Sequence, residues 1–524
     1  MNRKNLAMLM FGLLFVAFGW YANRFIEKTS FLIEGERYYV LFDDAMISMQ
    51  YAKTLADGHG LVWYPGAERV EGFSNPLWVF LMAAFHLLPL TSAQMGLPVQ
   101  ISAAIFLIIN LIFVRKLALL VTDNEWIALG AAFLTAFFFS LNNWSMQGME
   151  VSLATLLVTV TAFLMLSALQ QGKFSWGAYL LLGVGTLLRI DMIVPYLAFT
   201  GLMFLFDSEN RRRHLLVGLS VLIVFLAVQT AARYAYYGEW LPNTYYLKVG
   251  GITTLARVMK GVENFVQFIW TTGWFLYTIP LAIFFLRPKK STTILFLVVM
   301  GQVAYSVYVG GDAWEHRGGA NRFISVAMPL FFVLYVYALE LIRQALFAAR
   351  DERFPFAKVF SVIALAGIVV GSLFSFNTIL TNDSLLKWTL VKRPIFVSGT
   401  ERAVRMGLAI KSFTTPDASV MMATAGSISY FSERPGIDLY GKMDKVIART
   451  PQRTDTAFRP GHNKWDYDHS IATLLPDVIA QFADDSMDEA QPYLDEYGYK
   501  RVKFKDFIFY IREDSSYILW DVVK

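Results

Sequence analysis

The sequence predicts a polytopic α-helical membrane protein with about eleven transmembrane helices, followed by an α/β domain outside the membrane. Of its 524 residues, 56% are hydrophobic and 17% are charged, against about 45–50% and about 25% in soluble domains. Apolar runs of about 20 residues, the length that crosses a bilayer as a helix, recur up to residue 379. After that point strand-like and helix-like runs alternate, which indicates a small α/β domain.

The composition excludes several other classes of protein. Large apolar residues are too abundant for a disordered or collagen-like chain. The absence of cysteine excludes a disulfide scaffold, thiolate metal sites and cysteine nucleophiles. The 46 Lys and Arg residues exceed the 41 Asp and Glu residues, which gives a net charge of +5. Because the basic clusters lie at the ends of apolar runs, they favour basic cytoplasmic loops over nucleic-acid binding.

The first apolar run, about 6–21, predicts a membrane anchor with its N-terminus in the cytoplasm. It follows Arg3 and Lys4, and no small-x-small cleavage site comes after it, so a retained anchor is favoured over a signal peptide. Further spans are expected near 99–119, 125–142, 151–169, 176–189, 192–206, 215–236, 265–286, 291–309, 323–342 and 357–379.

The short apolar stretch 76–91, bounded by Pro76 and Pro89, decides the expected orientation. If it is a re-entrant or surface helix, every basic cluster between the later spans lies in the cytoplasm, as the positive-inside rule expects. These clusters are Arg115-Lys116, Arg211–Arg213, Arg287/Lys289/Lys290 and Arg343/Arg350/Arg353/Lys358. The N-terminus is then cytoplasmic and the C-terminus external.

On this topology the external face carries four loops and the C-terminal domain. The loops are 23–98, 142–150, 237–264 and 310–322. We expect a transmembrane module over 1–379 and an extracytoplasmic α/β domain over 380–524. In that domain 419–424, 499–504 and 507–511 are strand-like, whereas 401–413 and 471–482 are helix-like. The sequence shows no internal repeat of the kind that transporters often contain.

The first external loop contains the adjacent carboxylates Asp43 and Asp44. Such a pair could supply a general base or, together with Glu150, ligands for a divalent cation. The alternative is that they begin a helix, since Asp favours capping positions and 45–55 is helix-like. The two interpretations are compatible, because one Asp can cap while the other faces a cavity.

The second loop ends with Glu150, where the next span begins. A carboxylate at the edge of a span must be hydrated, paired or coordinated, although Glu150 could also be a helix N-cap. Arg189 and Asp191 lie at the outer end of a span pair, where they could simply neutralise one another. His59, in the first loop, is most simply a polar loop residue.

The third loop carries Lys248, and the fourth carries further cations that could bind a phosphate. Loop four contains His316, Arg317 and Arg322 beside four glycines, and cations over exposed backbone N–H groups make a plausible phosphate cradle. The alternative is salt-bridging of these cations to Asp312 and Glu315. No Walker A motif, dinucleotide fingerprint or HExxH motif is present, and the cytoplasmic loops are too short for a nucleotide-sugar domain. An activated sugar donor would therefore arrive on a lipid carrier.

Several motifs together resemble a known family. They are Asp43-Asp44-Ala45-Met46-Ile47-Ser48, Gly58-His59-Gly60-Leu61-Val62, Val70-Glu71-Gly72-Phe73-Ser74-Asn75, Leu241-Pro242-Asn243-Thr244, Gly310-Gly311-Asp312 and Ile428-Ser429-Tyr430-Phe431-Ser432 through Lys464. This set is similar to that of the GT-C polytopic glycosyltransferases, and most of all to the AftB-like group of mycobacterial terminal arabinofuranosyltransferases. Two stretches depart from the pattern: Ala313–Ala320 is insertion-like, and Arg189-Ile190-Asp191 replaces a more usual Arg-Pro-Glu.

The resemblance implies a GT-C type fold and an integral-membrane enzyme that uses a polyprenyl-phosphate-linked sugar on the side opposite the cytoplasm. The first-loop base would be Asp43 or Asp44, and Glu150 would match the second-loop acid of the wider superfamily. Expected donor-phosphate ligands are Lys248, His316, Arg317, Arg322 and Arg189. Expected acceptor or sugar contacts are Glu150, Asp191, His59, Glu71, Asn243, Tyr245 and Asp312.

The expected activity is inverting transfer of a sugar, with arabinofuranose the best match, to an extracytoplasmic glycan or glycoprotein acceptor. The leaving group is already a phosphate, so no metal is required, although Asp43, Asp44 and Glu150 could hold Mg²⁺, Mn²⁺ or Ca²⁺. A bacterial inner (plasma) membrane is the expected location, with the lipid bilayer as a partner and no nucleic acid. The alternative is a transporter or flippase of a lipid-linked saccharide.

Overall fold

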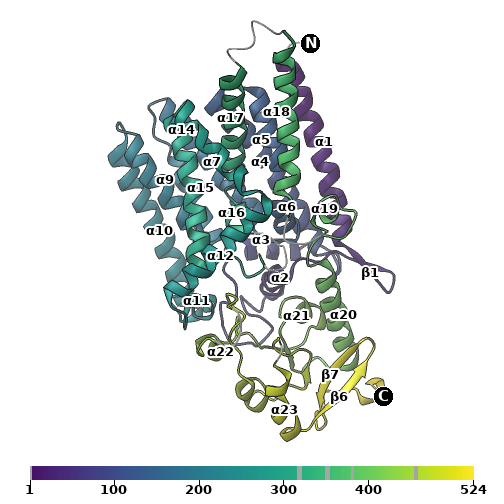
Figure 1. Cartoon of the computed structure of the whole chain (residues 1–524). Helices are drawn as coiled ribbons and strands as arrows, with labels where there is room; N and C mark the ends of the chain where they lie inside the picture. The colour runs from purple at the N-terminus through teal and green to yellow at the C-terminus, as the bar shows by residue number, and fades with distance from the viewer. Residues whose placement is uncertain are drawn as a thin grey trace.

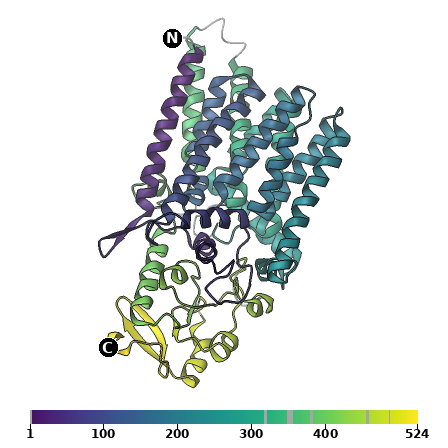
Figure 2. The same cartoon turned by 180° about the vertical axis from the view of Figure 1, so that it is seen from behind.

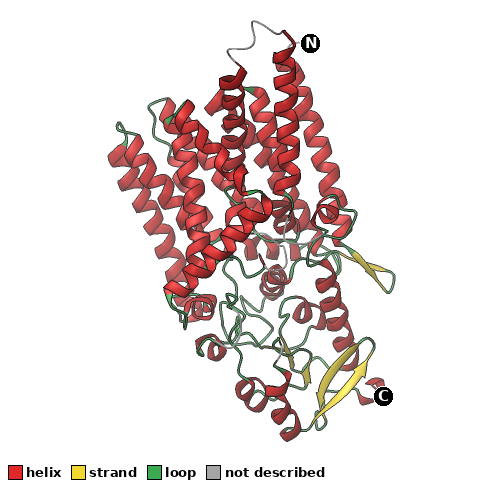
Figure 3. Cartoon of the chain, viewed as in Figure 1, coloured by secondary structure: helices red, strands yellow, loops and turns green. Residues whose placement is uncertain are grey.

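The computed structural model describes residues 3–315, 321–347, 355–378, 383–453, 458–484 and 486–523. It is a bundle of long helices with a smaller mixed α/β unit at one end, as Figures 1 and 3 show. The N-terminus lies at the opposite end of the bundle from this unit (Figures 1 and 2). The fold class expected from the sequence is therefore observed.

Seven helices in the described ranges are long and apolar enough to cross a membrane. They are α1 (Arg3–Thr29), α4 (Gly96–Thr122), α7 (Val151–Gln170), α10 (Arg211–Tyr237), α15 (Lys290–Val309), α17 (Met328–Phe347) and α18 (Pro355–Phe376). Two bent pairs bring the number to nine. They are α5 (Glu125–Ala136) with α6 (Phe139–Met146), bent by 52°, and α12 (Thr254–Thr272) with α13 (Trp274–Thr278), η2 (Ile279–Leu281) and α14 (Ala282–Leu286), bent by 103°.

The other two expected spans form shorter apolar helices. They are α8 (Trp176–Leu188) and α9 (Ile193–Phe206), which is preceded by the turn η1 (Ile190–Met192). A helix is therefore present at each of the eleven expected spans, and the two on either side of Arg189 and Asp191 have 13 and 14 residues. The ambiguous run 76–91 forms α3 (Pro76–His86), whose 11 residues are too few to span a bilayer. It lies across the end of the bundle (Figure 2).

The break between α5 and α6 is stabilised by the side chains of Asn377 and Trp388, and the indole N–H of Trp388 donates to the carbonyl of Phe137 at 2.8 Å. Asn377 Oδ1 accepts a hydrogen bond from the backbone N–H of Phe139 at 2.6 Å, and its Nδ2 donates to the carbonyl of Phe137 at 2.9 Å. These are backbone groups that the bend leaves without helical partners. Asn377, at the end of α18, therefore holds α6 at the end of the bundle that faces the α/β unit.

Basic residues gather at the end of the bundle where the N-terminus lies. Lys289 Nζ donates to the carbonyl of Val121 at 2.8 Å, and Lys290 Nζ donates to that of Phe206 at 3.4 Å. The C-terminal ends of α4 and α9 thus meet the start of α15, and α10 begins nearby with Arg211. The basic clusters Arg115-Lys116, Arg211–Arg213 and Arg287/Lys289/Lys290 therefore lie at the end of the bundle opposite the α/β unit (Figure 1).

The first loop forms a platform between the bundle and the α/β unit. It begins with an antiparallel hairpin, β1 (Phe31–Ile33) and β2 (Glu36–Tyr38), and continues with α2 (Asp43–Ala56). The backbone N–H of Phe42 donates to the carbonyl of Gln147 at 2.8 Å. This bond ties the start of α2 to the second loop, so the two loops form one surface.

The C-terminal segment contains a five-stranded sheet in the order β4-β3-β5-β7-β6. The strands are β3 (Val420–Met422), β4 (Gly436–Asp438), β5 (Val478–Ile479), β6 (Tyr499–Phe504) and β7 (Phe507–Arg512). β3 pairs in parallel with β4 and β5, whereas β7 is antiparallel to β5 and β6. The helices are α19 (Ser384–Trp388), α20 (Val397–Phe413), α21 (Ser427–Ser432), α22 (Lys445–Arg449), α23 (Met487–Glu496) and α24 (Trp520–Val523).

One expected element of this segment is wrong. The stretch 471–482 is not a helix: a π-helical turn, η4 (Asp468–Thr473), gives way to strand β5. Pro476 is the physical reason, because a proline disfavours the helical conformation of the residue before it, and Leu475 has a φ of 44°. The expected strands at 419–424, 499–504 and 507–511 and the expected helix at 401–413 are present as β3, β6, β7 and α20.

Candidate active site

The two first-loop carboxylates occupy the first turn of α2 but have different partners. Asp43 accepts hydrogen bonds from the backbone N–H of Ser427 at 2.7 Å and of Gly426 at 3.4 Å, at the start of α21. A Cβ at position 426 would stand 2.1 Å from the carbonyl oxygen of Asp43, so this approach requires glycine. Asp43 therefore joins the first loop to the C-terminal segment.

Asp44 lies among cationic and aromatic side chains. Its carboxylate oxygens are 2.5 Å from Lys442 Nζ and 3.6 Å from Arg322 Nη1. The indole N–H of Trp314 donates to the same carboxylate at 3.3 Å. The cations come from the C-terminal segment and from α16 (Arg322–Ser325), so three distant parts of the chain meet at Asp44.

The two carboxyl groups differ in acidity. Burial raises the pKa of Asp43 to about 6, although its hydrogen bonds from backbone amides oppose the shift. Burial would also raise the pKa of Asp44, but the charges of Lys442 and Arg322 outweigh it and hold that pKa well below its usual range. Asp43 can therefore exchange a proton near neutral pH, whereas Asp44 stays ionised.

Arg322 is held by the fourth loop and by the second. Its Nε lies 3.0 Å from Asp312 Oδ2, and its backbone N–H donates to the same oxygen at 3.2 Å. Its guanidinium carbon stands 5.2 Å from the centre of the Trp144 ring. These contacts aim the guanidinium at Asp44, and they place Asp312 behind it.

Lys248, in the last turn of α11 (Asn243–Val249), is the third cation of this cluster. Among the residues that the structure describes, no hydrogen bond or ion pair to its ammonium is recorded. Burial, followed by the charge of Arg322, lowers its pKa to about 8. Asp44 and Asp312 pair with Lys442 and Arg322, so Lys248 is the cation of this cluster that is best placed to pair with a bound anion.

A pair of anchors positions the turn that carries Lys442. Asn243 Nδ2 donates to the carbonyl oxygens of Gly441, Lys442 and Asp444 at 2.9, 3.0 and 3.1 Å. From the other side, the carboxylate of Asp438 accepts hydrogen bonds from the backbone N–H groups of Tyr440 and Met443 at 3.1 and 2.9 Å. Asn243 thus contacts backbone in this structure and holds a cation in place.

A second ion-pair network lies beside this cluster. Arg189 is 2.6 Å from Glu150 and 2.7 Å from Asp191, and Asn75 Nδ2 donates to the other oxygen of Glu150 at 2.8 Å. The guanidinium of Arg189 stands 5.2 Å from the ring centre of Phe323, the residue after Arg322. The mutual neutralisation considered for Arg189 and Asp191 is therefore what the structure shows, with Glu150 as a second acid.

Other expected site residues lie elsewhere. Glu71 pairs with Arg233 and so fixes the first loop to α10. His59 is exposed beyond the end of α2, and Tyr245 is 45% exposed; neither lines the cavity described below. His316 and Arg317 fall outside the described residues.

The carboxylates do not fit a metal site. Within the described ranges, no group of three or more His, Asp or Glu residues could hold a metal ion. Both oxygens of Glu150 are engaged by Arg189 and Asn75, and those of Asp43 by two backbone amides. The donor set considered for a divalent cation, Asp43, Asp44 and Glu150, is therefore dispersed over different partners.

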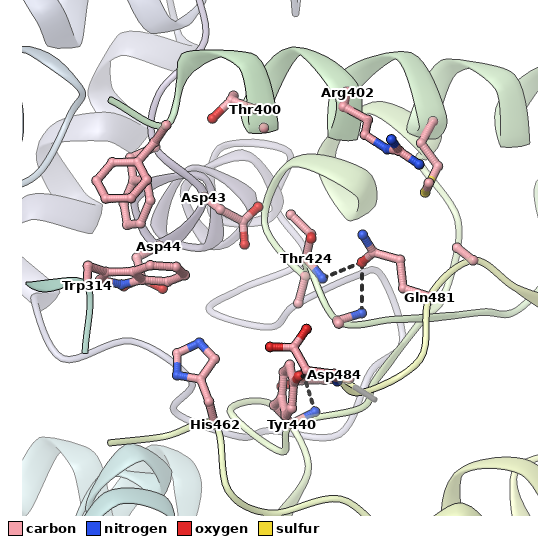
Figure 4. Close-up of a pocket in the computed structure, with 18 of the residues that line it drawn as sticks. Asp43, Asp44, Trp314, Thr400, Arg402, Thr424, Tyr440, His462, Gln481 and Asp484 are labelled. Carbon is pink, nitrogen blue, oxygen red and sulfur yellow. Dashed lines mark hydrogen bonds between the residues drawn. The ribbon is translucent and has the colours of Figure 1, made fainter. Parts of the chain in front are cut away.

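A cavity of about 700 Å³ opens in front of the two aspartates, between α2, the start of α20 and the C-terminal sheet (Figure 4). Trp314, Tyr440, Lys442 and His462 line it. The ring of His462 lies 5.3 Å from those of Trp314 and Tyr440, and burial, together with the charge of Lys442, lowers its pKa to about 4. This imidazole is therefore neutral at pH 7.

Sequence reasoning missed Lys442, His462, Trp314 and Tyr440 as site residues. Three of them belong to the tail patch 428–464, which carried part of the family resemblance. The resemblance of that patch to the family was the signal in the sequence that could have pointed to these three residues. Their contact with the first loop could not be read from it, because Lys442 and Asp44 are separated by 398 positions.

Comparisons with known proteins agree with this architecture. The family described as "Domain of unknown function (DUF8728)" matches residues 394–519. No curated protein matches the sequence. ArnT from Cupriavidus metallidurans, solved with bound undecaprenyl phosphate, is similar in structure with a TM-score of 0.56 at 11% identity, over 98% of this chain and 99% of ArnT.

A second solved structure gives the same result. The Archaeoglobus fulgidus oligosaccharyltransferase in its apo form has a TM-score of 0.59 at 11% identity, over 99% of this chain and 76% of that protein. The same enzyme tethered to an acceptor peptide with the NVT sequon gives a TM-score of 0.53 at 12% identity. ArnT and oligosaccharyltransferase are GT-C glycosyltransferases, so the chain has the GT-C type fold that the sequence suggested.

Proposed function

We propose that this chain is an integral-membrane inverting glycosyltransferase that moves a sugar from polyprenyl phosphate to an acceptor hydroxyl. The observation that carries the proposal is the position of Asp43 and Asp44 at one cavity, beside Lys248, Arg322 and Lys442. The fold adds support, since ArnT was solved with undecaprenyl phosphate and oligosaccharyltransferase with an acceptor peptide.

Asp43 is the general base of the proposed reaction. Its pKa of about 6 keeps it mostly ionised at pH 7, yet basic enough to accept a proton. The acceptor oxygen attacks the anomeric carbon as its proton passes to Asp43, and the bond between that carbon and the phosphate oxygen breaks. Asp44 is a poorer base because its charge is paired with Lys442, so its role is to hold the cations.

The cation cluster stabilises the leaving group. The electron pair of the breaking bond goes to the phosphate, so negative charge grows on it in the transition state. Lys248 has no recorded partner in the described residues and would meet this charge first, while Arg322 and Lys442 are already fixed by Asp312 and Asn243. Cations that are held in position before the reaction need little reorganisation during it.

The charge distribution supports one orientation in the membrane. The basic ends of the bundle would face the cytoplasm, and the first loop and C-terminal segment would lie outside, in the periplasm of a bacterial inner membrane. A polyprenyl phosphate in the outer leaflet would then place its phosphate near the first loop. The family resemblance favours arabinofuranose as the sugar and a cell-wall glycan or a glycoprotein as the acceptor.

The test uses the purified full chain in detergent with radiolabelled polyprenyl-phosphate sugars, arabinofuranose first, and extracted cell-wall glycan as the acceptor. We expect label in the glycan with the wild-type chain and labelling that is about 10²- to 10⁴-fold slower with Asp43→Asn. Detergent micelles have no compartments, so transport cannot produce this signal. Absence of transfer from every polyprenyl-phosphate pentose and hexose, with protein that still binds undecaprenyl phosphate, would overturn the proposal.

A further inference from the structure

We infer that the carboxyl ends of strands β3, β4 and β5 form the acceptor subsite, and that the acceptor is a neutral, polyhydroxylated glycan chain. This inference rests on the proposed glycosyltransferase function and adds the place and the chemistry of its second substrate. Most of the cavity wall contributed by the C-terminal sheet comes from residues at or just after the ends of these three strands, and Asp506 and Ile508 of the β6–β7 hairpin complete it.

The strand order makes this edge a natural binding place. β3 lies between β4 and β5 and runs parallel to both. In open sheets of this kind, ligands bind outside the carboxyl ends of the strands, where the chain leaves a central strand to either side. Thr424 follows β3, Tyr440 follows β4 and Gln481 follows β5, and all three line the cavity (Figure 4).

The part of the cavity at the ends of β3, β4 and β5, called the crevice below, extends to the proposed base Asp43. Thr424 stands two residues before Gly426, whose backbone N–H binds the Asp43 carboxylate. Figure 4 shows Asp43 and Thr424 facing one another from α2 and from the loop after β3. A hydroxyl of a glycan chain lying along the strand ends would therefore meet Asp43, and Asp44 with its partner Lys442 lines the same cavity.

Polar side chains in the crevice have hydrogen-bonding capacity to spare. Gln481 Oε1 accepts the backbone N–H groups of Ala423 and Thr424 at 3.1 and 2.7 Å, which fixes its amide and leaves its NH₂ for a ligand. Within the described ranges, no hydrogen bond is recorded for the hydroxyls of Thr400 and Thr424, and Thr400 is 7% exposed. Such groups need a polar partner when a ligand excludes water from them.

The charges favour a neutral ligand. Of the described lining residues, five are Asp and three are Lys or Arg. Two of the three cations are engaged, because Arg459 pairs with Asp484 at 2.9 Å and Lys442 with Asp44 at 2.5 Å. An anionic acceptor would meet uncompensated carboxylates, whereas hydroxyl groups can donate to them.

The shape favours a glycan over a peptide. An extended peptide usually binds by adding a strand to a sheet edge, and its affinity comes from backbone hydrogen bonds. The cavity is lined mainly by residues at the strand ends. In the described part of the chain only Asp438 of β4 and Ile508 of β7 bring strand residues to it, too few for a peptide to pair along. The rings of Tyr440 and Phe482 in its wall offer flat apolar surfaces for the C–H faces of sugar rings.

The inference is tested by saturation-transfer NMR on the full chain in nanodiscs without donor. The probes are neutral tetrasaccharides of arabinofuranose, galactofuranose, mannose and glucose, a tetragalacturonate and a Ser/Thr-rich peptide. We expect at least one neutral tetrasaccharide to bind, with affinity that falls about 3- to 10-fold in Thr424→Val and is retained in Thr424→Ser. Thr400→Val should lower it similarly.

Three results would overturn the inference. They are binding of no neutral glycan, binding of the galacturonate or the peptide in its place, and glycan affinity that is unchanged in both valine variants. A separate measurement of undecaprenyl phosphate binding distinguishes failure of this inference from failure of the proposed function. If the lipid binds and no glycan does, the acceptor inference alone fails; if a glycan binds and no sugar is ever transferred to it, the proposed function fails.

Discussion

The backbone N–H of Ser427 donates a 2.7 Å hydrogen bond to the carboxylate of Asp43 across 384 positions of sequence. This bond joins the first loop of the helical bundle to the start of a helix in the C-terminal segment. The site therefore belongs to neither part alone. Because Lys442 from the same segment reaches Asp44, both aspartates depend on the C-terminal segment for their surroundings.

Replacement of each aspartate by asparagine should separate their roles. Asp43→Asn keeps an oxygen for the N–H of Ser427, so the fold should persist while turnover falls about 10²- to 10⁴-fold through loss of the base. Asp44→Asn should mainly raise the KM for the lipid donor, because Lys442 and Arg322 lose their anchor. Steady-state kinetics measure both effects, and thermal unfolding checks that the two variants are as stable as the wild-type chain. Near-normal turnover of Asp43→Asn would contradict its role as the base.

The pH dependence of kcat/KM should be bell-shaped. Asp43 must be deprotonated, so activity should rise with pH through about 6, the value to which burial raises its pKa. Lys248 must be protonated to meet the phosphate, so activity should fall as pH rises through about 8. Lys248→Arg should remove the alkaline limb alone, and a profile that is flat between pH 5 and 9 would refute both assignments.

Removal of the Lys248 charge should weaken binding of the lipid donor and leave the fold intact. Its ammonium has no recorded partner in the described residues, so Lys248→Met breaks no ion pair, whereas Arg322→Met exposes Asp312. We expect Lys248→Met to weaken undecaprenyl phosphate binding about tenfold or more, the usual scale for a charge-assisted bond. Calorimetric titration with the lipid measures it, and unchanged affinity would remove Lys248 from the phosphate site.

Gly426 should tolerate no side chain. A Cβ there would stand 2.1 Å from the carbonyl oxygen of Asp43, so Gly426→Ala must push α21 away from α2. We expect a loss of stability of about 1–3 kcal/mol, as for overpacking in cores, and a loss of activity. Gly201→Ala, where no atom lies within 4 Å of the added Cβ, is the matched control. Equal thermal unfolding of the two variants would disprove the close approach.

Chelation should not affect the reaction. The carboxylates that could have held a divalent cation are engaged by Arg189, Asn75 and backbone amides. We therefore expect full transfer activity after dialysis against EDTA and no stimulation by Mg²⁺, Mn²⁺ or Ca²⁺. Activity that is lost on chelation and restored by one of these ions would show that a metal site forms when substrate binds.

Local features of the sequence predicted most of the fold. The apolar runs predicted the helices of the bundle, and the short, proline-bounded run 76–91 was expected to fall short of a full span, as α3 does. The helix expected at 471–482 failed because Pro476 and a left-handed Leu475 turn the chain into β5. Apolar content alone could not separate helix from strand there.

The site was less predictable because it depends on contacts between distant segments. Asp43, Asp44, Arg322 and Lys248 could be proposed from their residue types and loops. Lys442 could not be proposed in this way. Nothing local in the sequence shows that Asn243 holds the turn that carries Lys442, and so brings Lys442 to the first loop. The same limit applies to Glu71, whose pairing with Arg233 required the position of α10.

The most direct test of the account is an experimental structure of the full chain with bound undecaprenyl phosphate. The account predicts the phosphate within hydrogen-bond distance of Lys248 and Arg322, beside Asp44 at the edge of the cavity that Asp43 borders. A phosphate bound at the opposite, basic end of the bundle, or on the far side of α2 from Asp43, would contradict it.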